Sequence, residues 1–268
     1  MTFRAERVRR WAMYSHTLLV LAFLLLPLLV IVPVSLTSGN TLIFPTPGVS
    51  LRWYEEVVTD PRWVGALWNS LLVGVSSTML ATIMGVLAAI GLAWGSFPGR
   101  KLIYAVAAAP LVAPIVIVGV ASFSFYATLG LVGNRLSLVL THAALAVPVV
   151  LTTVTASLAG FDRTLMRAAA SLGAGHAQAV VRVLLPLIAP GVATGALIAF
   201  IISFDEVVVA SFLSVAEQRT LPRLIFSGVR ESVSPAIAAA AILLIAFSAC
   251  LLGLVGWIQS RSKRGARL

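Results

Sequence analysis

The chain has 268 residues, of which 60% are hydrophobic and only 10% are charged. This composition lies outside the range of soluble globular domains and indicates an integral membrane protein. The net charge is +10, but the basic residues lie between apolar segments rather than on one soluble face, which argues against a nucleic-acid-binding protein.

Six apolar segments are long enough to cross a bilayer, because about 20 apolar helical residues span a hydrocarbon core of about 30 Å. They are residues 14–36, 67–94, 102–128, 136–158, 189–213 and 234–258. The sequence therefore predicts an all-α membrane protein with six transmembrane helices. Its expected organisation is a basic N-terminus (1–13), a six-span domain (14–258) and a basic tail (259–268). The first apolar segment is too long for a signal peptide, so we expect it to be retained.

The basic residues also predict the orientation of the spans. With the N-terminus inside, 13 of the 19 lysines and arginines fall in the two termini and in the loops on their side of the membrane. Positive charge concentrates on the cytoplasmic side of membrane proteins. We therefore expect both termini in the cytoplasm.

The loop between the fourth and fifth predicted spans, residues 159–188, contains two short helical patterns that meet at a glycine corner. Good helix formers run from Arg163 to Leu172, "GAG" interrupts them, and "HAQAVVRVLL" resumes helical spacing until Pro186. From spacing alone, this segment fits equally well a surface helix that covers the bundle.

Two acidic residues, Asp205 and Glu206, lie inside the fifth predicted span, in "FIISFDEVVVASF". A carboxylate near the bilayer centre costs about 2.5 to 3.5 kcal/mol on insertion scales, so each acid is a candidate functional residue. In one continuous helix, neighbouring side chains point about 100° apart, and the two acids would face different sides. The Glu206 face would be a small, partly polar stripe: Gly195, Ala199, Ser203, Ala210 and Ser214. The Asp205 face would be apolar: Ile198, Ile201, Ile202, Val209 and Phe212.

The glycine-cornered loop resembles the EAA loop of ABC importer permeases. That pattern is Glu-Ala-Ala, three residues, Gly, nine residues, Ile, one residue, Leu-Pro. Here Ala168-Ala169, Gly173 and Leu185-Pro186 fit every spacing, while Arg167 takes the glutamate position with inverted charge. "APLVAPIVIVG", "SFDEVVVASFLS", "TLPRLIFSGVRESVSPAIAAAAILLI" and the basic tail resemble the second permease of spermidine and putrescine ABC importers.

This resemblance implies a transport subunit and not an enzyme, in a bacterial cytoplasmic (inner) membrane. The expected partners are membrane lipid, a second permease subunit in a heterodimer, two ATPase subunits and an extracytoplasmic substrate-binding protein. ATP and magnesium would be bound by the ATPase subunits, and no cofactor by this chain. The loop that couples to the ATPase subunits would comprise Arg167, Ala168, Ala169, Gly173, Ala174, Gly175, Leu185 and Pro186.

The residues themselves agree with a chain that has no catalytic site. Neither lysine stands in a Gly-Lys-Ser/Thr loop that could hold phosphate. The three histidines, His16, His142 and His176, lie too far apart for a metal site, and we interpret His142 as a packed polar residue.

The predicted function is to form half of the translocation pathway for a small organic cation of the spermidine or putrescine type. Candidate pathway residues are Asp205, Glu206, Ser203, Trp53 and Tyr126. The acids would coordinate a cation or, alternatively, hold this permease to its partner. The aromatic rings would stack on an ammonium, although Trp53 also suits a role as an interface anchor.

Three alternatives remain open at this point. An importer of the same class could carry another small amine, an opine or an aminophosphonate. An ion-coupled secondary transporter could use Asp205 and Glu206 to bind a coupling proton, and would need no ATPase. An assembly subunit of a membrane enzyme complex would fit the composition, but it leaves the glycine-cornered loop unexplained.

Overall fold

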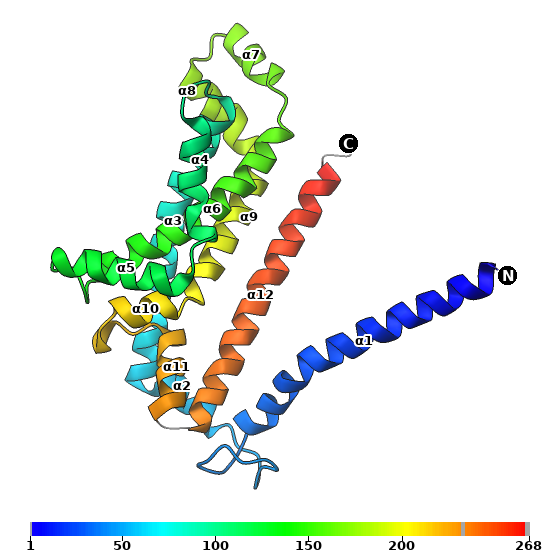
Figure 1. Cartoon of the computed structure of the whole chain (residues 1–268), viewed down its shortest axis with the longest axis vertical. Coiled ribbons are helices and arrows are strands. Elements are labelled where there is room, and N and C mark those ends of the chain that lie inside the picture. Colours follow the sequence, from blue (N-terminus) through cyan, green and yellow to red (C-terminus); the bar gives the residue numbers. More distant parts are fainter. Residues whose placement is uncertain (1, 232–233, 266–268) are drawn as a thin grey trace. The chain divides into compact units, whose positions relative to one another are not determined.

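The computed structural model describes residues 2–231 and 234–265, and the last three residues of the predicted basic tail lie outside this range (Figure 1). Regular structure in the described part is helical, apart from one antiparallel bridge between Thr37 and Val49. The chain divides into two compact units, Met1–Asp60 with Ser227–Ala246 and Pro61–Phe226 with Phe247–Leu268. Of the helices, α11 (Leu221–Glu231) and α12 (Pro235–Gly265) contribute to both.

The first unit contains α1 (Thr2–Ser35) and α2 (Arg52–Thr59). Helix α1 exposes the apolar side chains of its membrane-length stretch, as expected for a helix that meets lipid or another subunit. Two side-chain bonds join α2 to the end of α1 and the loop that follows. The Ser35 and Tyr54 hydroxyls lie 2.6 Å apart, and Trp53 Nε1 donates to the Thr37 carbonyl at 2.9 Å.

The second unit is built on three long helices that pack side by side: α3 (Pro61–Trp94), α6 (Arg135–Ala159) and α9 (Leu185–Phe204) (Figure 1). Small side chains allow this close approach. A Cβ atom at Gly85 of α3 would lie 2.6 Å from Val150 Cβ of α6, which only glycine avoids. The fully buried core includes Ala81, Ala89, Ala146, Val150, Leu151, Val154, Leu184 and Ala199.

The predicted third span is not one straight helix. It consists of α4 (Arg100–Ala108), the short η1 (Ala109–Leu111) and α5 (Ile115–Thr128), with a bend of 102° between the two parts. Pro110 and Pro114 flank the bend, and proline cannot donate the backbone bond that would continue a helix. By length and apolar composition the described residues therefore hold five candidate spans, or six if the bent pair is one.

The other predicted spans correspond to long helices, with one correction. Residues 136–158 coincide with α6 to within a residue at each end. The predicted spans 14–36, 67–94 and 234–258 fall on α1, α3 and α12, of which α1 and α3 begin earlier and α12 ends later than predicted. The α1 and α12 helices run through the predicted domain boundaries at residues 13 and 258. The prediction of one continuous helix over 189–213 is wrong, because α9 ends at Phe204 and the short α10 (Val208–Leu213) follows.

The segment that leads into α9 contains the predicted loop. It comprises α7 (Thr164–Ser171), α8 (His176–Ala179) and a π-helical turn, η2 (Val180–Leu184), which continues directly into α9. In a π-turn each N–H bonds to the carbonyl five residues back, so the turn holds one residue more than an α-helical turn.

Candidate functional site

The chain leaves helical geometry between α9 and α10 without a glycine or a proline. The three residues at the break are Asp205, Glu206 and Val207. The Glu206 carboxylate folds forward and accepts backbone N–H bonds from Val209 at 2.8 Å and from Ala210 at 3.0 Å. The first N–H groups of a helix have no carbonyl partner within it, and a side-chain acceptor that satisfies them stabilises a helix start at that point.

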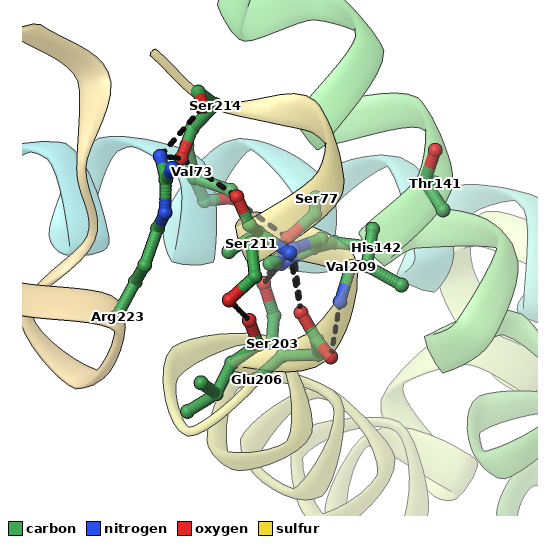
Figure 2. Close-up of polar contacts among 12 residues, drawn as sticks. Val73, Ser77, Thr141, His142, Ser203, Glu206, Val209, Ser211, Ser214 and Arg223 are labelled. Atoms are coloured by element: carbon green, nitrogen blue, oxygen red, sulfur yellow. Dashed lines mark hydrogen bonds and ion pairs between the residues drawn. The ribbon is translucent and has the colours of Figure 1, made fainter. Parts of the chain in front are cut away.

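Glu206 belongs to a buried polar cluster that we define by four side chains: Glu206, His142, Ser203 and Ser77. His142 Nε2 of α6 lies 3.5 Å from Glu206 Oε2, within ion-pair range, and these two side chains are 0% and 3% exposed. His142 Nδ1 lies 2.8 Å from Ser203 Oγ, which lies 2.7 Å from Ser77 Oγ of α3. Figure 2 shows this cluster, which joins α3, α6 and α9 to the break.

Asp205 has a different environment from its neighbour. Its side chain is exposed, and it makes no hydrogen bond or ion pair with any residue that the structure describes. Its backbone N–H closes the last turn of α9 on the Ile201 carbonyl at 3.0 Å. The break thus separates two adjacent carboxylates into one that is buried with partners and one that is free to meet an external charge.

The predicted faces of the fifth span survive only in part, because no single helix carries them. The members of the small stripe, Gly195, Ala199, Ser203, Ala210 and Ser214, are all buried. They are divided between α9 and the α10 segment that ends at its cap residue Ser214, with Glu206 in the break, so the stripe is not the continuous helical surface that the spacing predicted.

The two aromatic candidates lie in separate places. Tyr126 of α5 is buried in an apolar cluster that includes Val209 and Leu213 of α10. Trp53 belongs to the other compact unit, and the Arg52 guanidinium already lies 4.3 Å from its ring centroid. The structure therefore groups Ser203 with Glu206 and packs Tyr126 beside α10, whereas Trp53 has an arginine of its own unit as its cation.

Sequence reasoning missed the role of His142 and Ser77. His142 was interpreted as a packed polar residue, and Ser77 was not considered. The contacts join residues 77, 142 and 203 across three helices, so no local spacing indicates them.

The predicted coupling loop forms a helix-corner-helix in which backbone geometry ends the first helix. Gly173 has φ +84°, in the left-handed region that favours glycine. Its N–H bonds to the Ala170 carbonyl, and the Ala174 N–H bonds to the Ala169 carbonyl. These two bonds are those of a Schellman motif, the common glycine-dependent end of an α-helix.

Most of the candidate loop residues face outward. Arg167, Ala168, Gly173, Gly175 and Pro186 are exposed, Ala174 and Leu185 are half-buried, and Ala169 is buried. A concavity of about 540 Å³ opens between α7 and α8. Its lining residues are Trp94, Arg163, Met166, Arg167, Ala170, Ala174, His176 and Ala179.

Charged side chains fix the start of α7. Arg163 donates to the Ala93 carbonyl at 3.1 Å and lies over the Trp94 ring at the end of α3. Asp162 accepts from the Thr164 hydroxyl at 2.6 Å and from its N–H at 2.8 Å. These bonds, together with the nearby positive charge of Arg167, hold the pKa of Asp162 below its ordinary value. The positive charge of Arg167 therefore already acts on an acid of its own chain.

Comparison with known proteins identifies the family. Residues 81–264 match the family described as "binding-protein-dependent transport system inner membrane component". The chain is 34% identical over 255 residues to the putrescine transport system permease protein PotI of Escherichia coli, covering 92% of this chain and 90% of that one. It is 32% identical over 232 residues to the spermidine/putrescine permease protein PotC of Haemophilus influenzae, covering 87% and 90%. It is also 29% identical to the trehalose permease protein SugB of Mycobacterium tuberculosis, covering 90% of each.

Solved structures share the fold. A bacterial ABC transporter involved in alginate import has a chain that matches with a TM-score of 0.71 at 17% identity, covering 98% of this chain and 99% of that one. The MetNI methionine ABC transporter matches with a TM-score of 0.57 at 20% identity, covering 76% and 94%. The family match decides against the ion-coupled carrier and the enzyme-assembly subunit. The chain belongs to the binding-protein-dependent transport system inner membrane components and is a permease subunit of an ABC importer, a multi-pass inner-membrane protein that leaves ATP binding and hydrolysis to separate subunits.

Proposed function

We propose that this chain forms half of the translocation pathway of an importer for a small organic cation of the polyamine type. The observation that carries the proposal is the 30 to 34% identity, over most of the chain, to permeases named for spermidine and putrescine. The trehalose permease at 29% identity indicates that sequence similarity of this degree extends across substrates. The choice of a polyamine as substrate therefore needs support from a chemical feature of the chain.

The exposed carboxylate of Asp205 supplies that support. It lies at the break between α9 and α10, where no cation among the described residues forms an ion pair with it. A free carboxylate attracts an ammonium group and repels the carboxylate of an opine or the phosphonate of an aminophosphonate. Glu206, in contrast, is satisfied by two backbone N–H groups and His142, so Asp205 is the acid in this pair that we assign to the substrate.

The complex that we propose follows from the loop and from the charge pattern. The α7–α8 corner lies on the cytoplasmic side, with both termini, and contacts an ATPase subunit. A second, different permease completes the pathway, and an extracytoplasmic binding protein delivers the substrate. The exposed corner residues and the concavity between α7 and α8 support the placement of the ATPase contact.

Uptake by the reconstituted importer tests the substrate and Asp205 together. Proteoliposomes that contain this chain, its partner permease and the ATPase subunits, supplied with the binding protein and internal ATP, should accumulate labelled putrescine or spermidine. Asp205→Asn should reduce uptake about tenfold, because a hydrogen bond to a charged group contributes about 1.5 to 3 kcal/mol. The matched control is Glu55→Gln, which neutralises an exposed carboxylate of α2.

Two results would overturn this proposal. Accumulation of trehalose, an opine or an aminophosphonate, but of no polyamine, would refute the substrate class. Full polyamine uptake by Asp205→Asn would remove this residue from the pathway while leaving the substrate class intact.

Chemical crosslinking tests the ATPase contact. In a Cys250→Ser background, which removes the only cysteine of the chain, Ala174→Cys should crosslink to an ATPase subunit. Ser38→Cys, an exposed position that the charge pattern places on the opposite side of the membrane, should not. Equal crosslinking at both positions, or none at Ala174 and its neighbours in the loop, would contradict the proposed contact.

A further inference from the structure

The buried polar cluster lies where the fifth predicted span is interrupted, at the break between α9 and α10. The residue that joins the cluster to α10, Glu206, directly follows the exposed Asp205. A backbone movement at Glu206 would therefore turn the peptide that it shares with Asp205. We propose that His142 is a positioning residue: by holding Glu206 at the break, it fixes the direction of the Asp205 carboxylate. This inference rests on the proposed function, in which Asp205 meets the substrate.

Side chains of three helices follow one another to the carboxylate at the break. Both Glu206 oxygens accept a backbone N–H, as an ionised carboxylate does. The His142 ring faces this carboxylate through Nε2 and faces Ser203 Oγ through Nδ1. Ser203 Oγ lies 2.7 Å from Ser77 Oγ, and the Ser77 hydroxyl donates to the Val73 carbonyl of its own helix at 2.7 Å. His142 thus connects the serines of α9 and α3 to Glu206.

Residue type alone does not account for the break. The sequence Asp-Glu-Val has no residue that excludes a helix, and apolar residues flank it on both sides. Without the His142 ring that faces it within ion-pair range, the buried Glu206 carboxylate would lose its side-chain partner, which favours movement toward water. Such a movement would release the N–H groups of Val209 and Ala210 and allow the chain to rejoin α9 and α10 differently.

His142 and its neighbour on α6, Thr141, differ in their contacts. Thr141 is also buried, and Figure 2 shows it apart from the cluster. Its hydroxyl donates to the Ser137 carbonyl of the same helix at 2.9 Å. Replacement of Thr141 removes a buried polar group without touching the break. Thr141→Val is therefore the matched control for substitutions of His142.

Thiol labelling measures the position of residue 205 independently of transport. The assembled complex would carry Cys250→Ser and Asp205→Cys in this chain, and its modification by the cationic reagent 2-aminoethyl methanethiosulfonate would be followed by the intact mass of the chain. Addition of His142→Ala should change the labelling rate about tenfold or more, since small displacements have effects of this size on reaction geometry. Thr141→Val should leave the rate unchanged. His142→Gln, which keeps an amide donor, should restore much of the original rate.

Each outcome bears on the inference. An unchanged labelling rate in His142→Ala, in a complex of normal yield, would overturn it. Loss of assembly in both His142→Ala and His142→Gln would assign His142 to packing instead. In chains that retain Asp205, His142→Ala should also raise the KM for putrescine more than it lowers the maximal rate. A change in labelling without any change in uptake would confirm that His142 positions Asp205 and would refute the proposed role of Asp205 in transport.

Discussion

The corner between α7 and α8 and the break between α9 and α10 both interrupt a helical path, but by different means. At the corner the backbone itself ends the helix, because Gly173 adopts φ +84° and two N–H groups turn back onto α7. At the break the Glu206 side chain starts the next helix, and it faces His142 of α6, which contacts Ser203 and through it Ser77 of α3. The corner is exposed and local, whereas the break is buried and depends on residues distant in the sequence.

The two interruptions should therefore be sensitive to different substitutions. The corner should respond to substitutions that change backbone preference and should not depend on distant residues. The break should respond to substitutions of its side-chain partners and should not depend on the exposed Asp205.

Glu206→Ala should be the most disruptive substitution at the break. It leaves His142 buried without its acid and leaves two N–H groups at the start of α10 without an acceptor. Removal of one partner of a buried pair costs about 3 to 5 kcal/mol. The measurement is the thermal unfolding midpoint of the purified complex, and Asp205→Ala, at the exposed neighbour, should stay within about 0.5 kcal/mol. Equal effects at both positions would mean that the cluster does not hold the break.

Gly173→Ala should be the most disruptive substitution at the corner. An added Cβ meets no atom within 4 Å, so the penalty is one of backbone conformation alone, about 1 to 2 kcal/mol. Gly175→Ala is the matched control, because Gly175 has φ −64° and equally open surroundings. The measurement is the affinity of the permease pair for its ATPase subunits. Equal affinities in the two variants would contradict the dependence on the left-handed geometry.

Arg167→Glu restores the charge that the resemblance leads one to expect at the corner. An exposed ion pair contributes about 0 to 1 kcal/mol, so the change in ATPase affinity should be at most about fivefold. We expect weaker coupling, measured as substrate imported per ATP hydrolysed, because Asp162 and the cognate ATPase surface would then face a negative charge. Arg167→Gln separates loss of charge from inversion. Improved coupling in Arg167→Glu would indicate that the usual contact of the family is still available.

Acid should loosen the start of α7. The Thr164 hydrogen bonds lower the pKa of Asp162, so their contribution to stability is present above the ordinary pKa of an aspartate, about 3.9, and is lost as the pH falls through the lowered value. Hydrogen exchange of the α7 amides, measured at decreasing pH, should show faster opening in this range. Asp162→Asn should make that opening independent of pH, and a persistent pH dependence in this variant would point to another group.

How well the sequence predicts each region depends on how far apart in the chain the interacting residues lie. The long apolar segments predict α1, α3, α6 and α12, because burial in lipid depends on local composition. The glycine corner is predictable for the same reason, since Gly173 acts on its own backbone. Pro110 and Pro114 indicate the 102° bend from the local sequence, whereas hydropathy alone does not. The α9–α10 break has no such signal, because Glu206 alone does not reveal that His142 will face it.

The π-turn between α8 and α9 sets the direction in which the loop points around the α9 axis. An α-helix advances about 100° per residue, so the extra residue in Val180–Leu184 turns everything that precedes it by that angle around the α9 axis. Deletion of one residue there would leave a smooth helix from His176 to Phe204, yet α8 and the corner at Gly173 would point to another side of the bundle. The fixed count of residues from Gly173 to Leu185-Pro186 therefore specifies a direction as well as a distance.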